Sequence, residues 1–259
     1  MLNYIRMQQQ RTPLQFVPNF ILLVFMSTIL SSLGCSNGES SQQVLPPTTP
    51  VVVSSVPASG TSAVPFNTSI AVTFNVDIDP ATLTPSTFYV SNVSGTVAYN
   101  ATNVTAVFHP AAPMAANTTY TVVLTTGIKS TAGATFAQQY SFSFSTGNVP
   151  DTTPPTITTV VPANGSTNVP LNTQVTVTFS EAMDPTGLVG STVTGLPASL
   201  AYNSQTFTAT LAPTSLLAPN TTYSATVYGT ARDLAGNQMG AQITCGRSQL
   251  PHNSHVSLN

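Results

Sequence analysis

The chain has 259 residues, a formal net charge of −2 and only 5% charged residues. Disordered chains combine low hydrophobicity with high charge, so a content of 41% hydrophobic residues with so few charges excludes that class. Nucleic-acid-binding proteins carry a basic stripe that neutralises phosphates. Five Lys and Arg residues cannot supply one, so we expect no nucleic-acid partner.

Residues 1–34 are typical of an export signal. Arg6 and Arg11 precede an apolar run over 20–30, which is too short to span a bilayer comfortably. Small residues then lead directly to Cys35. This resembles a bacterial lipoprotein signal, which is cleaved before a Cys that becomes acylated. The resemblance implies lipid attachment at Cys35 and export to the envelope, and the uncharged Ser36 is compatible with an outer membrane or the cell surface. Ordinary signal cleavage and an uncleaved anchor are the alternatives.

Residues 35–50 are rich in Ser, Gln, Pro and Thr and predict an extended tether, because such a segment buries little apolar surface. Beyond it the chain repeats itself at an offset of about 105 residues, a pattern that predicts two similar domains. The recurring segments are Val56-Pro57-Ala58-Ser59-Gly60 with Val161-Pro162-Ala163-Asn164-Gly165, Val72-Thr73-Phe74 with Val177-Thr178-Phe179, and Asp79-Pro80 with Asp184-Pro185.

Short alternating runs separated by Pro, Gly and Asn predict about seven strands in each copy. In the first copy the predicted strands are 69–74, 88–90, 97–99, 104–108, 122–124 and 140–144, after an opening run at 51–56. No segment has helical periodicity, so we predict an all-β protein with two tandem Ig-like antiparallel β-sandwiches. Tyr120 and Tyr223 both stand where a late strand begins, which resembles the tyrosine corner of such folds.

The second copy ends differently from the first. Ile243-Thr244-Cys245-Gly246-Arg247 stands where the first copy has the aromatic alternation of 140–144. We therefore expect the second sandwich to lack a well-formed last strand and to expose an unpaired edge. A strand supplied by another chain and a truncated or frame-shifted gene are both open explanations.

Three motifs of the second copy are similar to bacterial Ig-like domains first described in surface-layer proteins. They are the Val-Pro-x-x-Gly opening, the block Val177–Pro185 and the loop Asp233–Asn237. The likeness covers about three quarters of the chain and implies an extracellular stalk or spacer without catalysis. The expected parts are a signal (1–34), a tether (35–50), a first Ig-like domain (51–147), a Pro-rich linker (148–155), an incomplete second domain (156–246) and a polar tail (247–259).

The acidic residues are the first candidates for a site. Asp77 with Asp79, and Glu181 with Asp184, occupy the same turn in the two copies and are weak candidates for calcium binding. We favour a structural role, in which Asp79 and Asp184 cap the turn made by the following Pro, and Asp233 caps its loop. We expect no metal site and no cofactor.

Other reactive side chains are too scattered to form a catalytic centre. His109 stands alone, and His252 and His255 have at most Cys245 nearby, too few ligands for zinc. The chain has no Gly-x-Ser-x-Gly elbow and no phosphate loop. If Cys35 is acylated, Cys245 is the only free thiol and no intrachain disulfide can form. We predict that the protein is not an enzyme.

The expected function is that of a lipid-anchored envelope protein, an Ig-like structural or adhesive spacer. The expected partner is the membrane, through the lipid, with an envelope protein or a glycan as further candidates. One alternative is a glycan- or protein-binding module that uses the aromatic residues Phe88, Tyr89 and Tyr228. Another is a fragment of a larger surface adhesin or enzyme.

Overall fold

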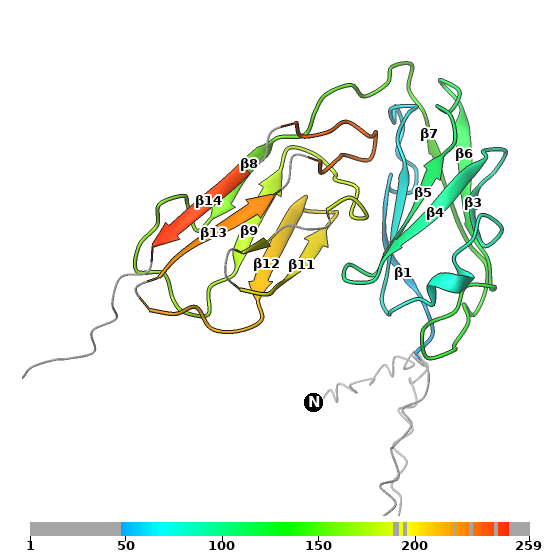
Figure 1. Cartoon of the computed structure of the whole chain (residues 1–259). Helices are drawn as coiled ribbons and strands as arrows, with labels where there is room; N and C mark the ends of the chain where they lie inside the picture. Colours follow the sequence, from blue (N-terminus) through cyan, green and yellow to red (C-terminus); the bar gives the residue numbers. More distant parts are fainter. Residues whose placement is uncertain are drawn as a thin grey trace, which may run out of the picture. The chain divides into compact units, whose positions relative to one another are not determined.

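The computed structural model describes residues 48–188, 192–193, 196–219, 221–227, 230–240 and 243–248. Both copies of the duplicated pattern belong to one compact unit. The described residues form β-strands and a single short 3-10 helix (Figure 1), and none of their helices is long and apolar enough to cross a membrane. The predicted signal, most of the tether and the chain beyond residue 248 lie outside the described residues.

The first copy has seven strands in two antiparallel sheets, as predicted. Its elements are β1 (Val52–Val56), β2 (Ile70–Phe74), the helix η1 (Pro80–Thr82), β3 (Phe88–Val90), β4 (Gly95–Asn100), β5 (Thr105–Pro110), β6 (Thr119–Leu124) and β7 (Tyr140–Ser145). One sheet has the order β1-β2-β5-β4 and the other the order β3-β6-β7. The chain thus passes from one sheet to the other after β2, after β3 and after β5, as in an Ig-like sandwich.

The second copy repeats this arrangement strand for strand. Its elements are β8 (Ile157–Val161), β9 (Val175–Phe179), β10 (Thr192–Val193), β11 (Ala198–Asn203), β12 (Thr208–Pro213), β13 (Thr222–Val227) and β14 (Ile243–Ser248). The sheet orders are β8-β9-β12-β11 and β10-β13-β14, and every strand pair is antiparallel. The prediction of two tandem all-β sandwiches is confirmed.

The core of the first copy lies where its two sheets face each other. Ile70, Val72 and Phe74 of β2 are at most 3% exposed and belong to the same apolar cluster as Phe142 and Phe144 of β7. This is the alternation expected of a strand that buries one face. The second copy has an equivalent core around β9, β12 and β13.

The repeated opening motif has a conformational reason. Gly60 and Gly165 have φ angles of +80° and +79°, and a side chain at either position would be strained. The same left-handed turn therefore follows β1 and β8, which explains why the Val-Pro-x-x-Gly pattern occurs in both copies.

The prediction that the second sandwich lacks a well-formed last strand is wrong. Strand β14 runs over six residues, the same length as β7, and pairs with β13 from Ile243–Val227 to Ser248–Thr222. Ladder hydrogen bonds come from the backbone, so the missing aromatic alternation does not prevent pairing. The strand also includes Arg247 and Ser248, which we assigned to the polar tail.

Candidate functional site

The linker between the copies is held by paired hydrogen bonds. Asn67, in the loop before β2, donates through Nδ2 to the Asp151 carbonyl and accepts through Oδ1 from the Asp151 N–H, both at 2.8 Å. Asn237, in the loop between β13 and β14, donates to the same carbonyl at 3.2 Å. The backbone of Asp151 therefore connects both copies.

Leu234 anchors the second copy to the outer face of a sheet in the first. The residue is 4% exposed and shares an apolar cluster with Ala71 of β2 and Val107 of β5. Its carbonyl accepts a hydrogen bond from the Ser69 N–H at 2.7 Å. Ala71 alternates with the core residues of β2, so it is buried by the second copy and not by its own core.

A second set of contacts lies at the hairpin between β4 and β5. Asn100 donates through Nδ2 to the Pro185 carbonyl at 2.7 Å, and Asn103 accepts through Oδ1 from the Tyr202 N–H. His109 of β5 lies 3.7 Å from Asp184, measured from Nε2 to Oδ2. His109 is therefore not isolated, as it appeared in the sequence, but lies against the turn that follows β9.

Three carboxyl groups meet beside these contacts. Asp151 of the linker, Glu181 of the turn after β9 and Asp233 of the β13–β14 loop each place a carboxylate oxygen within 4.8 Å of the others. Asp151 and Glu181 are half-buried, and Asp233 is 2% exposed. We call these residues the carboxyl cluster. Among the described residues, no Lys or Arg forms an ion pair with it.

The cluster changes the acidity of one of its members. Burial raises the pKa of Glu181 to about 7, and the charges of Asp151 and Asp233, with a hydrogen bond from the protonated Glu181 to Asp151, act in the same direction. Like-charged carboxylates this close disfavour ionisation of all members at once. The arrangement therefore suits a proton held on Glu181 beside the carboxylate of Asp151.

The carboxylate of Asp233 already has hydrogen-bond donors. Its Oδ1 accepts from the Asn237 N–H at 2.9 Å, and its Oδ2 accepts from Asn237 Nδ2 at 2.8 Å. These bonds confirm the predicted role of Asp233 in capping its loop. Calcium takes six to eight oxygen ligands, and the cluster offers three acidic side chains. The three carboxyl groups alone would therefore supply only part of a calcium site.

The calcium candidates proposed from sequence do not converge on one point. Asp79 Oδ1 accepts from the Ala81 N–H at 3.0 Å, and Asp184 Oδ1 accepts from the Thr186 N–H at 2.8 Å. Both residues thus cap the turn at the following Pro, as predicted. Asp77 is exposed, and Glu181 belongs to the carboxyl cluster.

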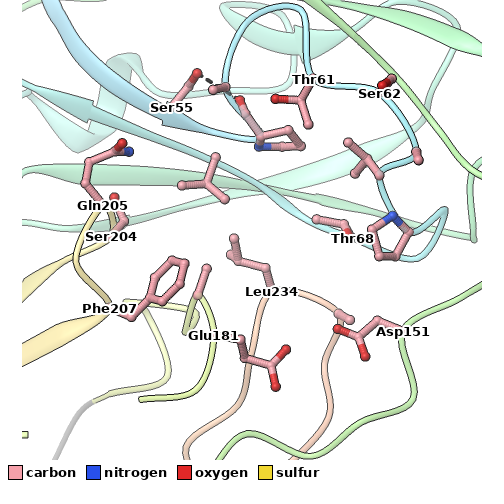
Figure 2. A pocket seen from close by; sticks show the side chains of 18 residues that line it. Ser55, Thr61, Ser62, Thr68, Asp151, Glu181, Ser204, Gln205, Phe207 and Leu234 are labelled. Carbon is pink, nitrogen blue, oxygen red and sulfur yellow. Dashed lines mark hydrogen bonds between the residues drawn. The ribbon is translucent and has the colours of Figure 1, made fainter. Parts of the chain in front are cut away.

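A cavity of about 430 Å³ lies next to the cluster. Figure 2 shows Asp151, Glu181 and Leu234 on one side of it and the hydroxyl groups of Ser55 and Ser62 on the other. The cavity has polar hydroxyl and amide groups and two carboxylates in its lining, and no Lys, Arg or His. Water can therefore reach Asp151 and Glu181 from this side.

Tyrosine hydroxyl groups accept equivalent backbone hydrogen bonds in both copies. Tyr120 accepts from the Ala115 N–H at 2.8 Å and Tyr223 from the Ala218 N–H at 2.9 Å, which confirms the tyrosine corner. A second pair was not predicted. Tyr99 accepts from the Ile78 N–H at 3.0 Å and Tyr202 from the Met183 N–H at 2.8 Å.

The aromatic candidates for ligand stacking lie elsewhere. Phe88 is fully buried in the first core, so it cannot stack on a glycan, and Tyr89 is half-buried. Tyr228 lies outside the described residues, as do Cys35, His252, His255 and the side chain of Cys245.

Comparison with known proteins supports the fold. A model described as a bacterial Ig-like domain matches residues 46–146 and 151–248. No curated protein matches the chain. Among solved structures, the N-terminal part of the bacterial S-layer protein SbsC is 23% identical over 78% of this chain and 44% of that one, with a TM-score of 0.32. The L,D-transpeptidase 3 from Mycobacterium tuberculosis is 14% identical over 77% of this chain and 90% of that one, with a TM-score of 0.28.

These similarities are too low to transfer an activity, and the chain spans less than half the length of the S-layer structure. The family match is broader, because its two segments together cover most of the chain. The protein therefore belongs to the bacterial Ig-like domain family and carries two copies of that domain in tandem.

Proposed function

We propose that the protein is a non-enzymatic spacer of the bacterial cell envelope, anchored by lipid at Cys35. The observation that carries the proposal is the order of its parts. A segment that resembles a lipoprotein signal and a Pro-rich segment precede two bacterial Ig-like domains. Domains of this kind serve as modules on surface proteins, and acyl chains on one Cys hold such a module at a membrane.

The contacts between the copies support a spacer role. Leu234 and the Asn67–Asp151 pair join the two domains at several points, so the tandem resists bending at the linker. A spacer needs this property because a freely hinged pair would not hold a distance. In this proposal the lipid attaches the protein to the membrane, the tether separates the domains from the membrane surface, and the two domains set the length of the spacer.

Metabolic labelling with a fatty-acid probe tests the anchor. We expect label on the wild-type protein and none on Cys35→Ser. Cys245→Ser is the matched control, because it removes the other Cys of the chain and should keep the label. Label that persists in Cys35→Ser, or is absent from the wild type, would refute lipid anchoring at this residue.

A further inference from the structure

The carboxyl cluster lies where the two domains are joined, and each member is linked to a contact that crosses the junction. The backbone of Asp151 exchanges two hydrogen bonds with Asn67. Asp233 precedes Leu234, which packs on the outer face of the first domain. Glu181 precedes Ala182, which packs against the same apolar cluster. A change of charge in the cluster therefore acts on three connections at once.

We propose that this junction is a proton-operated latch, closed when Glu181 of the carboxyl cluster is protonated and loosened when it loses that proton. The closed state keeps Leu234 on Ala71 and Val107 and keeps Asn67 bonded to Asp151. When the proton is lost in the closed arrangement, three negative charges lie within 4.8 Å of one another and repel. Separation of the loops relieves the repulsion, and the open cavity lets water hydrate the charges.

The other charged groups at the junction do not neutralise the cluster. Asp184, in the same turn as Glu181, faces His109 of β5. Arg232 precedes Asp233 but is exposed, and no ion pair joins it to a described carboxylate. The charge of Glu181 acts on Tyr202 of β11, but Tyr202 stays neutral because burial raises the pKa of its hydroxyl to about 12. The part of the first domain that lines the cavity has no titratable side chain.

The sign of the effect follows from the raised pKa of Glu181. In the separated state Glu181 titrates near its ordinary value of 4.5, and in the closed state near 7. The proton therefore favours the closed latch fully below about pH 4.5, and this preference is lost as the pH rises through 7.

Amide hydrogen exchange at two positions tests the latch. The N–H groups of Ser69 and Asp151 donate across the junction, to the Leu234 carbonyl and to Asn67 Oδ1. We expect their protection, corrected for intrinsic exchange, to fall about tenfold between pH 5.5 and pH 8.5. Titration from pH 5.5 through a pKa of about 7 would give about thirtyfold, and solvent screening of the half-buried Glu181 reduces this. EDTA is present throughout, so that no divalent cation neutralises the cluster.

Three variants test whether the carboxyl cluster causes the loss of protection at high pH. Glu181→Gln should keep high protection at both pH values. Asp151→Asn removes a neighbouring charge while retaining an oxygen for its bond from the Thr153 N–H, so it should lose less protection than the wild type. Asp77→Asn, which removes an exposed acid from the equivalent turn of the first domain, should lose protection like the wild type. Protection that does not change with pH in the wild type, or that falls in Glu181→Gln as much as in the wild type, would overturn the proposal.

The use of such a latch rests on the proposed location outside the cytoplasm, where the protein meets the pH of its surroundings. The two proposals fail separately. Hydrogen exchange tests the latch on the purified protein, whereas fatty-acid labelling tests the anchor in cells. If hydrogen exchange supported the latch and labelling showed no lipid, the junction would still be a pH-dependent joint, but in an exported protein that is not lipid-anchored.

Discussion

Replacing Leu234 with Ala tests whether one side chain couples the two domains. The truncation removes about three buried carbon groups at about 0.8 kcal/mol each. We therefore expect the junction to lose about 2 to 3 kcal/mol, the low end of the range for Leu→Ala in protein cores. The low end applies because the adjacent cavity lets neighbouring side chains and water relax into the space. The backbone bond from Ser69 to the Leu234 carbonyl remains.

Urea unfolding measures this loss. The chain has no Trp and eight Tyr residues, so tyrosine fluorescence and circular dichroism are the suitable signals. In the wild type we expect the two domains to unfold at similar urea concentrations. In Leu234→Ala the less stable domain should unfold at a lower urea concentration, because it has lost the support of its partner.

The first domain provides the matched control. Thr131 holds the position equivalent to Leu234, because Ser130 pairs with Ile78 as Asp233 pairs with Met183. Thr131 is exposed, so Thr131→Ala should change the free energy of unfolding by less than about 0.5 kcal/mol. If both variants changed stability equally little, the Leu234 contact would not couple the domains and our account of the junction would be wrong.

Three further predictions concern stability. Tyr202→Phe should cost about 1 to 3 kcal/mol in urea unfolding, because it leaves the buried Met183 N–H without its acceptor. Gly95→Ala should cost about 1 to 3 kcal/mol or more in the same assay, because the new methyl group would collide with the ring of Phe108. Glu181→Gln should raise the melting temperature at pH 8 and not at pH 4, because the wild-type carboxyl loses its stabilising proton as the pH rises through about 7. We expect the free energy of unfolding at pH 8 to increase by about 1 kcal/mol, a value limited by solvent screening of a half-buried group.

Most of the fold could be predicted from the sequence because sandwich strands carry a local signal. The alternation of Ile70, Val72 and Phe74 and the Gly at each opening turn depend on neighbouring residues only. The last strand could not be predicted in this way. Strand β14 is defined by backbone pairing to β13, and its side-chain pattern gives little sign of that pairing.

The site was harder to predict because its parts are distant in the sequence. The capping roles of Asp79, Asp184 and Asp233 are local, and each was predicted. The meeting of Asp151 with Glu181 depends on how a linker passes a turn about thirty residues away, and no local pattern encodes it.

The differences between the two copies nevertheless contained a signal. Glu181 and Leu234 have Val76 and Thr131 at the equivalent positions of the first domain, and Asp233 has Ser130. A duplicated chain serves as its own control, because positions required by the fold alone should agree in both copies. Positions that differ in chemistry therefore point to surroundings that only one copy has. Here these surroundings are the linker and the outer face of the first domain. Glu181, Asp233 and Leu234 belong to motifs that resemble those of bacterial Ig-like domains, and in this chain the second copy uses them to make that contact.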